Sequence, residues 1–97
     1  MEGAIRAQVL KRLVASFQKL TDFGAVEGLF NNLFTRTERV MFAKRLAIAV
    51  LLERGTPYSV ISKTLKVSNS TIGFVRNHIM SGNREYTALI KSLDKII

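Results

Sequence analysis

The sequence contains no cysteine and has a single histidine and a single proline. Without cysteine there is neither a disulfide framework nor a thiolate metal site, and a reducing compartment is the simpler expectation. One histidine, with no cluster of acids at metal-binding or triad spacing, disfavours an enzyme. We therefore expect no catalytic residues, no bound metal and no cofactor.

Long apolar runs are also missing. The longest, Leu46 to Leu52, is too short to cross a bilayer. Arginine and lysine interrupt each apolar run of the first 14 residues, which is unlike the apolar core of a secretory signal. We expect a cytoplasmic, nucleoid-associated protein with no membrane partner.

Acidic residues are scarce. Fifteen lysines and arginines against seven acids give a formal charge of +8, which suits duplex DNA, RNA or an anionic membrane surface. No acid lies between positions 54 and 84, where the basic residues are Arg54, Lys63, Lys66, Arg76 and Arg84. A solvated face would mix both signs, so this segment is a candidate anion-binding surface.

Apolar residues recur at helical spacing, and no segment alternates with period two, so the sequence predicts an all-α protein of about six helices. We expect one helical domain over residues 1–97, with dimerisation helices in 1–34, a central helix in 35–55, a helix-turn-helix in 56–80 and a last helix in 83–97. A chain of 97 residues buries a marginal core, so a partner subunit would help.

Helix boundaries follow from capping residues. An amphipathic helix is expected over residues 3–20, and Asp22 is the N-cap expected for a second helix to about Leu33. Residues 35–38 read Thr-Arg-Thr-Glu, a capping box that predicts a strong central helix. That helix is nearly all-round apolar, from Val40 to Leu52, and should end at Arg54 and Gly55.

Two short helices follow on either side of Lys66-Val67-Ser68. Pro57 is expected in the first turn of a helix to Leu65, and Ser68 should cap a second helix through Ile79 or Met80, ended by Gly82, before the last helix from about Asn83. This tight connection is typical of a helix-turn-helix, here spanning about Tyr58 to Asn77. The apolar residues that should hold it together are Ile61, Leu65, Val67, Ile72 and Val75.

The segment Ile-Ser-x-x-Leu-x-Val-Ser-x-x-Thr-Ile-x-x-Val at 61–75 resembles the helix-turn-helix consensus of bacterial repressors. Lys66 stands at the turn position that usually holds glycine, and a left-handed residue with a side chain costs roughly 1–2 kcal/mol. A wider stretch, residues 29–82, is similar to the Trp repressor family and its Trp-repressor-like relatives, through Leu33-Phe34-Thr35-x-x-Glu38-Arg39 and Arg45-Leu46-x-Ile48. The resemblance implies an interlocked homodimer that exchanges its first two and last helices and places two recognition helices one DNA turn apart.

The resemblance also implies a pocket in which the family holds the indole of tryptophan between two arginines. Arg45 matches the first arginine, whereas the second position holds Phe74. The glycine after it is Val75, and a serine near the helix end is His78. We expect an altered or filled pocket and hypothesise that Phe74 occupies the ligand's space, although tryptophan or another small effector stays possible. Arg45 is alternatively a surface residue or an ion-pair partner of Glu38 or Glu53.

DNA contacts are expected at the start of the recognition helix, where Asn69 can pair with adenine, Ser70 with base or phosphate, and Gly73 allows close backbone approach. Thr71 is a local cap or a phosphate contact. The full set of expected DNA-binding residues is Lys63, Lys66, Ser68, Asn69, Ser70, Thr71, Gly73, Arg76 and Asn77.

The function predicted is a sequence-specific, double-stranded DNA-binding regulator of the repressor type that does not depend on tryptophan. The alternative is a helix-turn-helix module that contacts RNA or a protein partner, although RNA recognition usually brings exposed aromatics and most aromatics here fall on apolar faces. A basic amphipathic helix at residues 3–20 lying on a membrane is a third reading.

Overall fold

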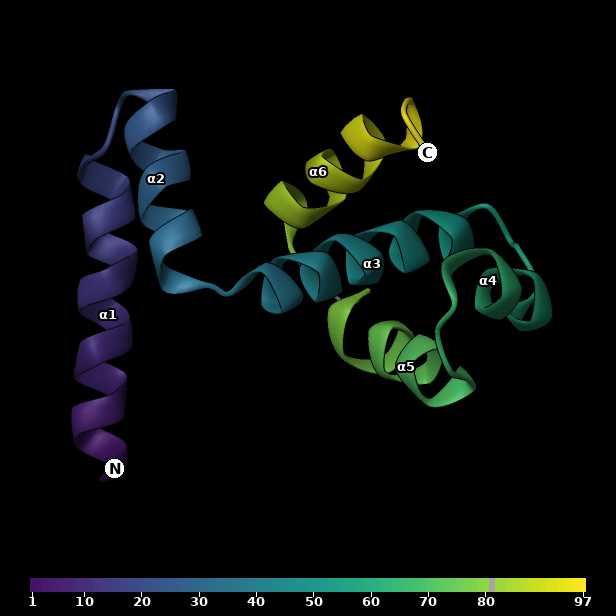
Figure 1. The fold of residues 1–97 in the computed structure, drawn as a ribbon, viewed down its shortest axis with the longest axis horizontal. Coiled ribbons are helices and arrows are strands. Elements are labelled where there is room, and N and C mark those ends of the chain that lie inside the picture. Colours follow the sequence, from purple (N-terminus) through teal and green to yellow (C-terminus); the bar gives the residue numbers. More distant parts are fainter. Residues whose placement is uncertain (81) are drawn as a thin grey trace. The chain divides into compact units, whose positions relative to one another are not determined.

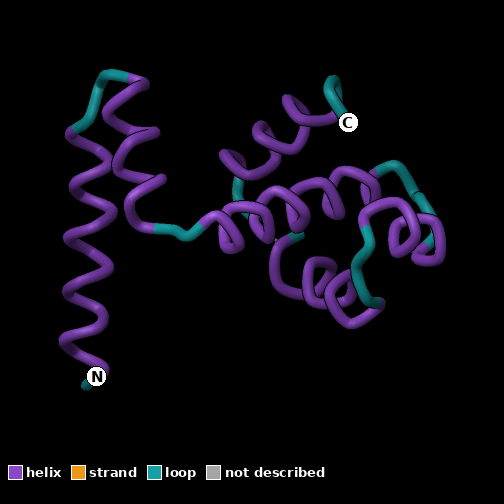
Figure 2. Tube along the Cα trace, viewed as in Figure 1, coloured by secondary structure: helices purple, strands orange, loops and turns teal. Residues whose placement is uncertain are grey.

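The structure, a computed structural model, describes residues 1–80 and 82–97. These residues contain six α-helices and one π-helical segment (Figure 1). The segments are α1 (Gly3–Lys19), α2 (Phe23–Leu33), α3 (Arg36–Glu53), α4 (Tyr58–Leu65), α5 (Asn69–Phe74), η1 (Val75–Ile79) and α6 (Arg84–Asp94). This part of the chain contains no strand (Figure 2), so the all-α prediction is confirmed. The chain divides into two compact units, residues 1–36 and 37–97.

The first unit contains α1 and α2, between which the chain reverses direction (Figure 1). The carboxylate of Glu2 accepts from the amide of Ala4 at 3.0 Å, and that of Asp22 accepts from the amide of Ala25 at 3.0 Å, which confirms Asp22 as an N-cap. Neither helix has a fully buried residue. Their apolar stripes therefore lack the burial that usually stabilises an amphipathic helix.

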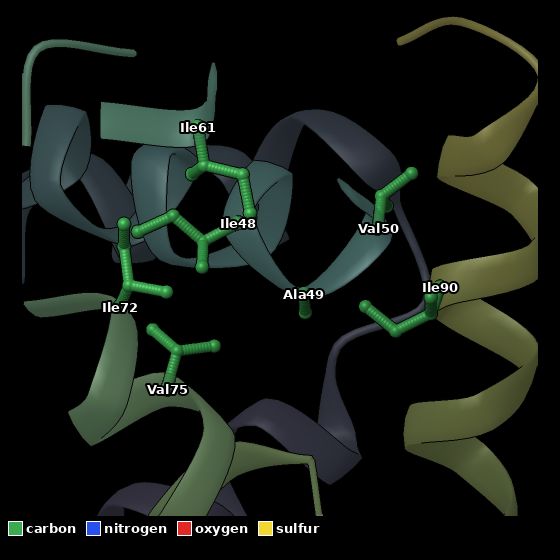
Figure 3. Close-up of a cluster of buried hydrophobic side chains, with 7 residues drawn as sticks. All are labelled: Ile48, Ala49, Val50, Ile61, Ile72, Val75 and Ile90. Carbon is green, nitrogen blue, oxygen red and sulfur yellow. The ribbon is translucent and has the colours of Figure 1, made fainter. Parts of the chain in front are cut away.

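The second unit has a core assembled from five helical segments (Figure 3). Three fully buried residues come from the end of α3, one from each of α4, α5, η1 and α6; they are Ile48, Ala49, Val50, Ile61, Ile72, Val75 and Ile90. The core thus fixes the two helices of the expected helix-turn-helix against α3.

Only the second half of α3 belongs to this core. Val40, Met41 and Phe42 in the first half are 37–44% exposed, although the sequence of this helix is apolar nearly all round, as predicted. The residues that α3 contributes to the apolar core of the second unit begin at Leu46.

Gly55 ends α3 as expected. Its φ is +77°, its amide donates to the carbonyl of Leu52, and the amide of Thr56 donates to that of Leu51, both at 3.0 Å. This pair of bonds is a Schellman motif. Pro57 then lies one residue before α4 and not in its first turn, because its carbonyl accepts the first bonds of α4, from Val60 and Ile61.

Arg54 fastens the end of α6 to the end of α3. Its guanidinium donates to the carboxylate of Asp94 at 2.6 Å, to the carbonyl of Asp94 at 2.7 Å and to the carbonyl of Ile97 at 2.6 Å. At its other end α6 is capped by the side chain of Asn83, which accepts from the amide of Tyr86. The last helix is therefore held at both ends by side chains.

Candidate nucleic-acid interface

The turn between α4 and α5 has the geometry that the motif requires. Lys66 adopts φ 55° and ψ 55°, the left-handed conformation expected at this position, and its amide donates to the carbonyl of Ser62. The amide of Val67 donates to the same carbonyl, and the hydroxyl of Ser62 donates to the carbonyl of Val67 at 2.6 Å. Ser62 thus holds both sides of the turn.

The apolar residues predicted to hold the motif together are buried. Ile61, Ile72 and Val75 have no exposed surface, and Leu65 and Val67 are half-buried against the same core. Contacts between α4 and α5 accompany this packing. The helix-turn-helix predicted from the spacing of these residues is confirmed as a fold element.

Ser68 caps α5 as predicted. Its hydroxyl accepts from the amide of Thr71 at 3.1 Å and lies 3.1 Å from the hydroxyl of Thr71. Both hydroxyls are therefore engaged in a local cap. To contact DNA, either hydroxyl would have to form a further hydrogen bond in addition to those of the cap.

Asn69, Ser70 and Gly73 form the outward edge of α5. The side chains of Asn69 and Ser70 are exposed and make no hydrogen bond with the described residues. A methyl group built on Gly73 would meet no atom within 4 Å. The absence of a side chain at position 73 is therefore not required by the packing of this chain, which leaves room for an outside molecule to approach the backbone.

The second helix of the motif changes type part-way. The sequence predicts one helix from Ser68 to Ile79 or Met80, whereas α5 ends at Phe74 and a π-helical segment, η1, continues to Ile79. The amide of Met80 donates five residues back, to the carbonyl of Val75 at 3.0 Å. Such a widened turn rotates the residues beyond it relative to a continuous α-helix, and π turns often occur at functional sites.

The basic side chains of the 54–84 segment differ in whether they are free to contact a partner at the outward edge of α5. Lys63, Lys66 and Arg76, together with the amide side chain of Asn77, are exposed. Arg54 is instead occupied by Asp94 and Ile97. The positive charge of the 54–84 segment is thus concentrated on and around the motif.

Arg76 has a partner that the sequence did not reveal. Its guanidinium lies near Tyr58, in the first turn of α4, and the interaction with that side chain raises the pKa of Arg76. Eighteen positions separate the two residues, and no helical spacing or motif relates them. Only the packing of α4 against the recognition helix could have identified the pair.

Comparison with known proteins yields one match. A family profile described as Trp repressor protein matches residues 8–94, nearly the whole chain. The chain belongs to the Trp repressor family. No curated protein and no solved structure gives a significant match. Membership of this family supports a regulatory, DNA-binding role for the helix-turn-helix.

Arg45, Phe74 and His78, the three residues expected at a ligand pocket, lie close together. The guanidinium of Arg45 lies 5.0 Å from the centre of the Phe74 ring, and the imidazole of His78 stacks on that ring with centroids 4.7 Å apart and planes inclined by 15°. Nδ1 of His78 lies 3.3 Å from the carbonyl oxygen of Phe74. Among the described residues, Nε of Arg45 is buried without a hydrogen-bond partner. Arg45 thus lies over the ring of Phe74.

No group of three histidines or acids is placed to hold a metal ion in residues 1–80 and 82–97. No described helix is long and apolar enough to cross a membrane.

Proposed function

We propose that this member of the Trp repressor family is a sequence-specific regulator of the repressor type that binds double-stranded DNA as a homodimer. The observation that carries the proposal is the outward edge of α5. Asn69 and Ser70 lie exposed there beside the half-buried Gly73, whereas Ile72 of the same helix and Val75, at the start of η1, are fully buried. A rigid helix that presents an amide side chain and an open backbone fits the major groove.

The charge around this edge supports a nucleic acid as the partner. Lys63, Lys66 and Arg76 are exposed on or beside the motif, and the sequence has no acid from residue 54 to residue 84. Cations of this kind bind phosphates and fix the register of the protein on the duplex. Base reading is assigned to Asn69 and Ser70, and close backbone approach to Gly73.

The homodimer is supported by apolar surface that neither unit covers by itself. In α1, Ile5, Val9, Leu10 and Val14 are 51–68% exposed, and Phe23 of α2 is 77% exposed. Contiguous apolar stripes of this size mark interaction surfaces. A second copy would bury them and would set the two recognition helices about 34–36 Å apart, one turn of DNA.

Independence from tryptophan is supported by Phe74. The centre of its ring lies 5.0 Å from the guanidinium of Arg45, the arginine that matches the family's pocket, and 4.7 Å from the centre of the His78 imidazole. A ring that belongs to the recognition helix itself takes the place of an added ligand beside Arg45. The helix is then held in its binding pose without an effector.

The test is selection of retained sequences from pooled random duplexes, with and without tryptophan, alongside mass measurement by light scattering. We expect a dimer, a palindromic site retained equally in both arms, and a logarithmic salt slope of several units. Strong affinity only in the presence of tryptophan would refute the role of Phe74. A charge-driven affinity with no preferred site would refute sequence-specific regulation and favour an RNA or protein partner.

A further inference from the structure

A cavity of about 200 Å³ lies where α6 packs on the end of α3. Part of its wall is apolar, because the buried Val50 and Ile90 line it together with the half-buried Met80 and Tyr86. An apolar protein cavity of about 150 Å³ is large enough to bind benzene. The thioether of Met80 and the ring of Tyr86 both make favourable contacts with aromatic groups. The volume and the wall therefore suit a molecule built on one aromatic ring.

The hydroxyl of Tyr86 is a polar group that this wall leaves unsatisfied. It is buried and has no hydrogen-bond partner among the described residues. The neighbouring hydroxyl of Thr87 instead donates to the carbonyl of Asn83 at 3.1 Å. A buried hydroxyl without a partner is destabilising, because it has lost its bonds to water. A buried water usually makes about three hydrogen bonds, so a ligand with a single oxygen matches this wall better than a water does.

Tyr86 is held in position at the start of α6. A methyl group built on Gly82 would come within 2.5–2.7 Å of Cβ, Cγ and Cδ2 of Tyr86, so the ring lies close to a backbone position that bears no side chain. The amide of Tyr86 donates to the side chain of Asn83 at 3.0 Å. A side chain that is already held loses little conformational freedom when its hydroxyl binds a ligand.

The charged residues around the cavity balance one another. Glu53, Arg54, Lys91 and Asp94 line it and are exposed. Arg54 and Asp94 form an ion pair at 2.6 Å, which leaves one acid, Glu53, and one base, Lys91. Because burying an unpaired charge is costly, this lining favours an uncharged ligand over a carboxylate.

We propose that this cavity binds a small uncharged aromatic alcohol of the size of phenol, whose ring packs against Val50, Met80 and Ile90 and whose oxygen accepts a hydrogen bond from Tyr86. The site goes beyond the proposed DNA-binding function and does not rest on it. Neither Arg45 nor Phe74 lines the cavity, so the site is separate from the pocket expected beside Arg45.

The test uses phenol and toluene, a pair of similar shape in which only phenol carries a hydroxyl. Binding is followed through the methyl resonance of Met80 in protein labelled at its methionine methyl groups, and Met80→Leu assigns that resonance. We expect phenol to shift it saturably at about 1 mM, as for so small a ligand. Benzoate, which carries a charge, should cause no saturable shift up to about 10 mM.

Two variants isolate the hydroxyl. Tyr86→Phe keeps the ring, and the ratio of phenol to toluene affinity should fall by about two- to tenfold, as for loss of one hydrogen bond. Tyr58→Phe is the matched control, because it removes the other tyrosine hydroxyl of the chain at a residue that does not line the cavity, and it should leave the ratio unchanged. Thermal unfolding first establishes that both variants are folded.

Three outcomes would overturn the inference. They are no saturable shift of the Met80 resonance with phenol, as when a second copy of the chain fills the cavity, a ratio that Tyr86→Phe leaves unchanged or that Tyr58→Phe lowers equally, and benzoate binding as tightly as phenol. Selection of a duplex by a protein that does not bind phenol would overturn this inference alone. Phenol binding by a protein that selects no duplex would overturn the proposed function alone.

Discussion

Lys66 occupies a backbone conformation that glycine adopts with less strain, at φ 55° and ψ 55°. We expect Lys66→Gly to raise the free energy of unfolding by roughly 1 kcal/mol, since a left-handed residue with a side chain costs about 1–2 kcal/mol and glycine loses part of that gain in chain entropy. Denaturant unfolding measures the change.

Lys66→Ala is the control for that substitution, because it removes the charge and keeps the Cβ atom. Its stability should stay within about 0.5 kcal/mol of the wild type. Both variants should weaken duplex binding equally if Lys66 contacts a phosphate. A glycine variant no more stable than the alanine variant would contradict the strain assigned to this turn.

Substitution of Gly73 should affect the stability of the fold and the affinity for DNA in opposite directions. A methyl group there meets no atom of this chain within 4 Å, so Gly73→Ala should stabilise the helix by about 0.5–1 kcal/mol. The same methyl would stand where DNA approaches, and we expect at least about a tenfold loss of duplex affinity, equivalent to about 1.4 kcal/mol. Unfolding and duplex titration of the one variant give both numbers, and undiminished affinity would remove Gly73 from the interface.

At the scale of elements, the sequence predicts the features that depend only on residues close to one another in the chain, such as helix caps and turns. The N-caps Asp22 and Ser68, the left-handed Lys66 and the C-terminal Gly55 are each local, and the structure places each where the sequence predicts it. The π turn at Val75 leaves no pattern of its own, because Phe74 to Ile79 has the spacing of an ordinary helix. The pairs Tyr58–Arg76 and Arg45–Phe74 join residues 18 and 29 positions apart in the sequence, and only tertiary packing brings them together.

The docking of α6 on α3 partly buries a tyrosine. Tyr86 lines a cavity of about 200 Å³ with Val50, Glu53 and Ile90. Its hydroxyl is buried and has no hydrogen-bond partner among the described residues. Burial raises the pKa of Tyr86, and the negative charge of Glu53 acts in the same direction.

That shift predicts how stability depends on pH. Since the folded pKa of Tyr86 lies above the unfolded value of about 10, the folded state holds the proton more tightly. The contribution is fully present below about pH 10 and is lost as the pH rises through the folded pKa. We expect the free energy of unfolding to fall more steeply above pH 10 in the wild type than in Tyr86→Phe. Parallel curves for the two proteins would contradict the buried hydroxyl.

At the scale of the whole molecule, the two units differ in how far each is stabilised by its own packing. The second has a core of seven buried residues, whereas α1 and α2 have none. The apolar stripes of α1 and α2 can be predicted from the spacing of apolar residues in the sequence. The surface that covers these stripes cannot, because local sequence patterns do not specify it. A helix pair without a buried face is marginal in water, so the first unit is where a second copy would matter most.

Val9 tests the proposed homodimer directly. Its side chain is 54% exposed in the single chain, so in a monomer Val9→Lys should change stability by no more than about 0.5 kcal/mol. In a dimer that covers the stripe of α1, the loss of one buried valine costs roughly 1.5–3 kcal/mol in each copy, and the dimer should dissociate. Gln8→Lys adds the same charge to the neighbouring exposed position of α1 and should leave the stability and the oligomeric state unchanged. Light scattering and unfolding midpoints, measured over a roughly hundredfold range of protein concentration, decide between monomer and dimer, because the midpoint of a dimer depends on protein concentration. A midpoint independent of concentration in all three proteins would refute the dimer.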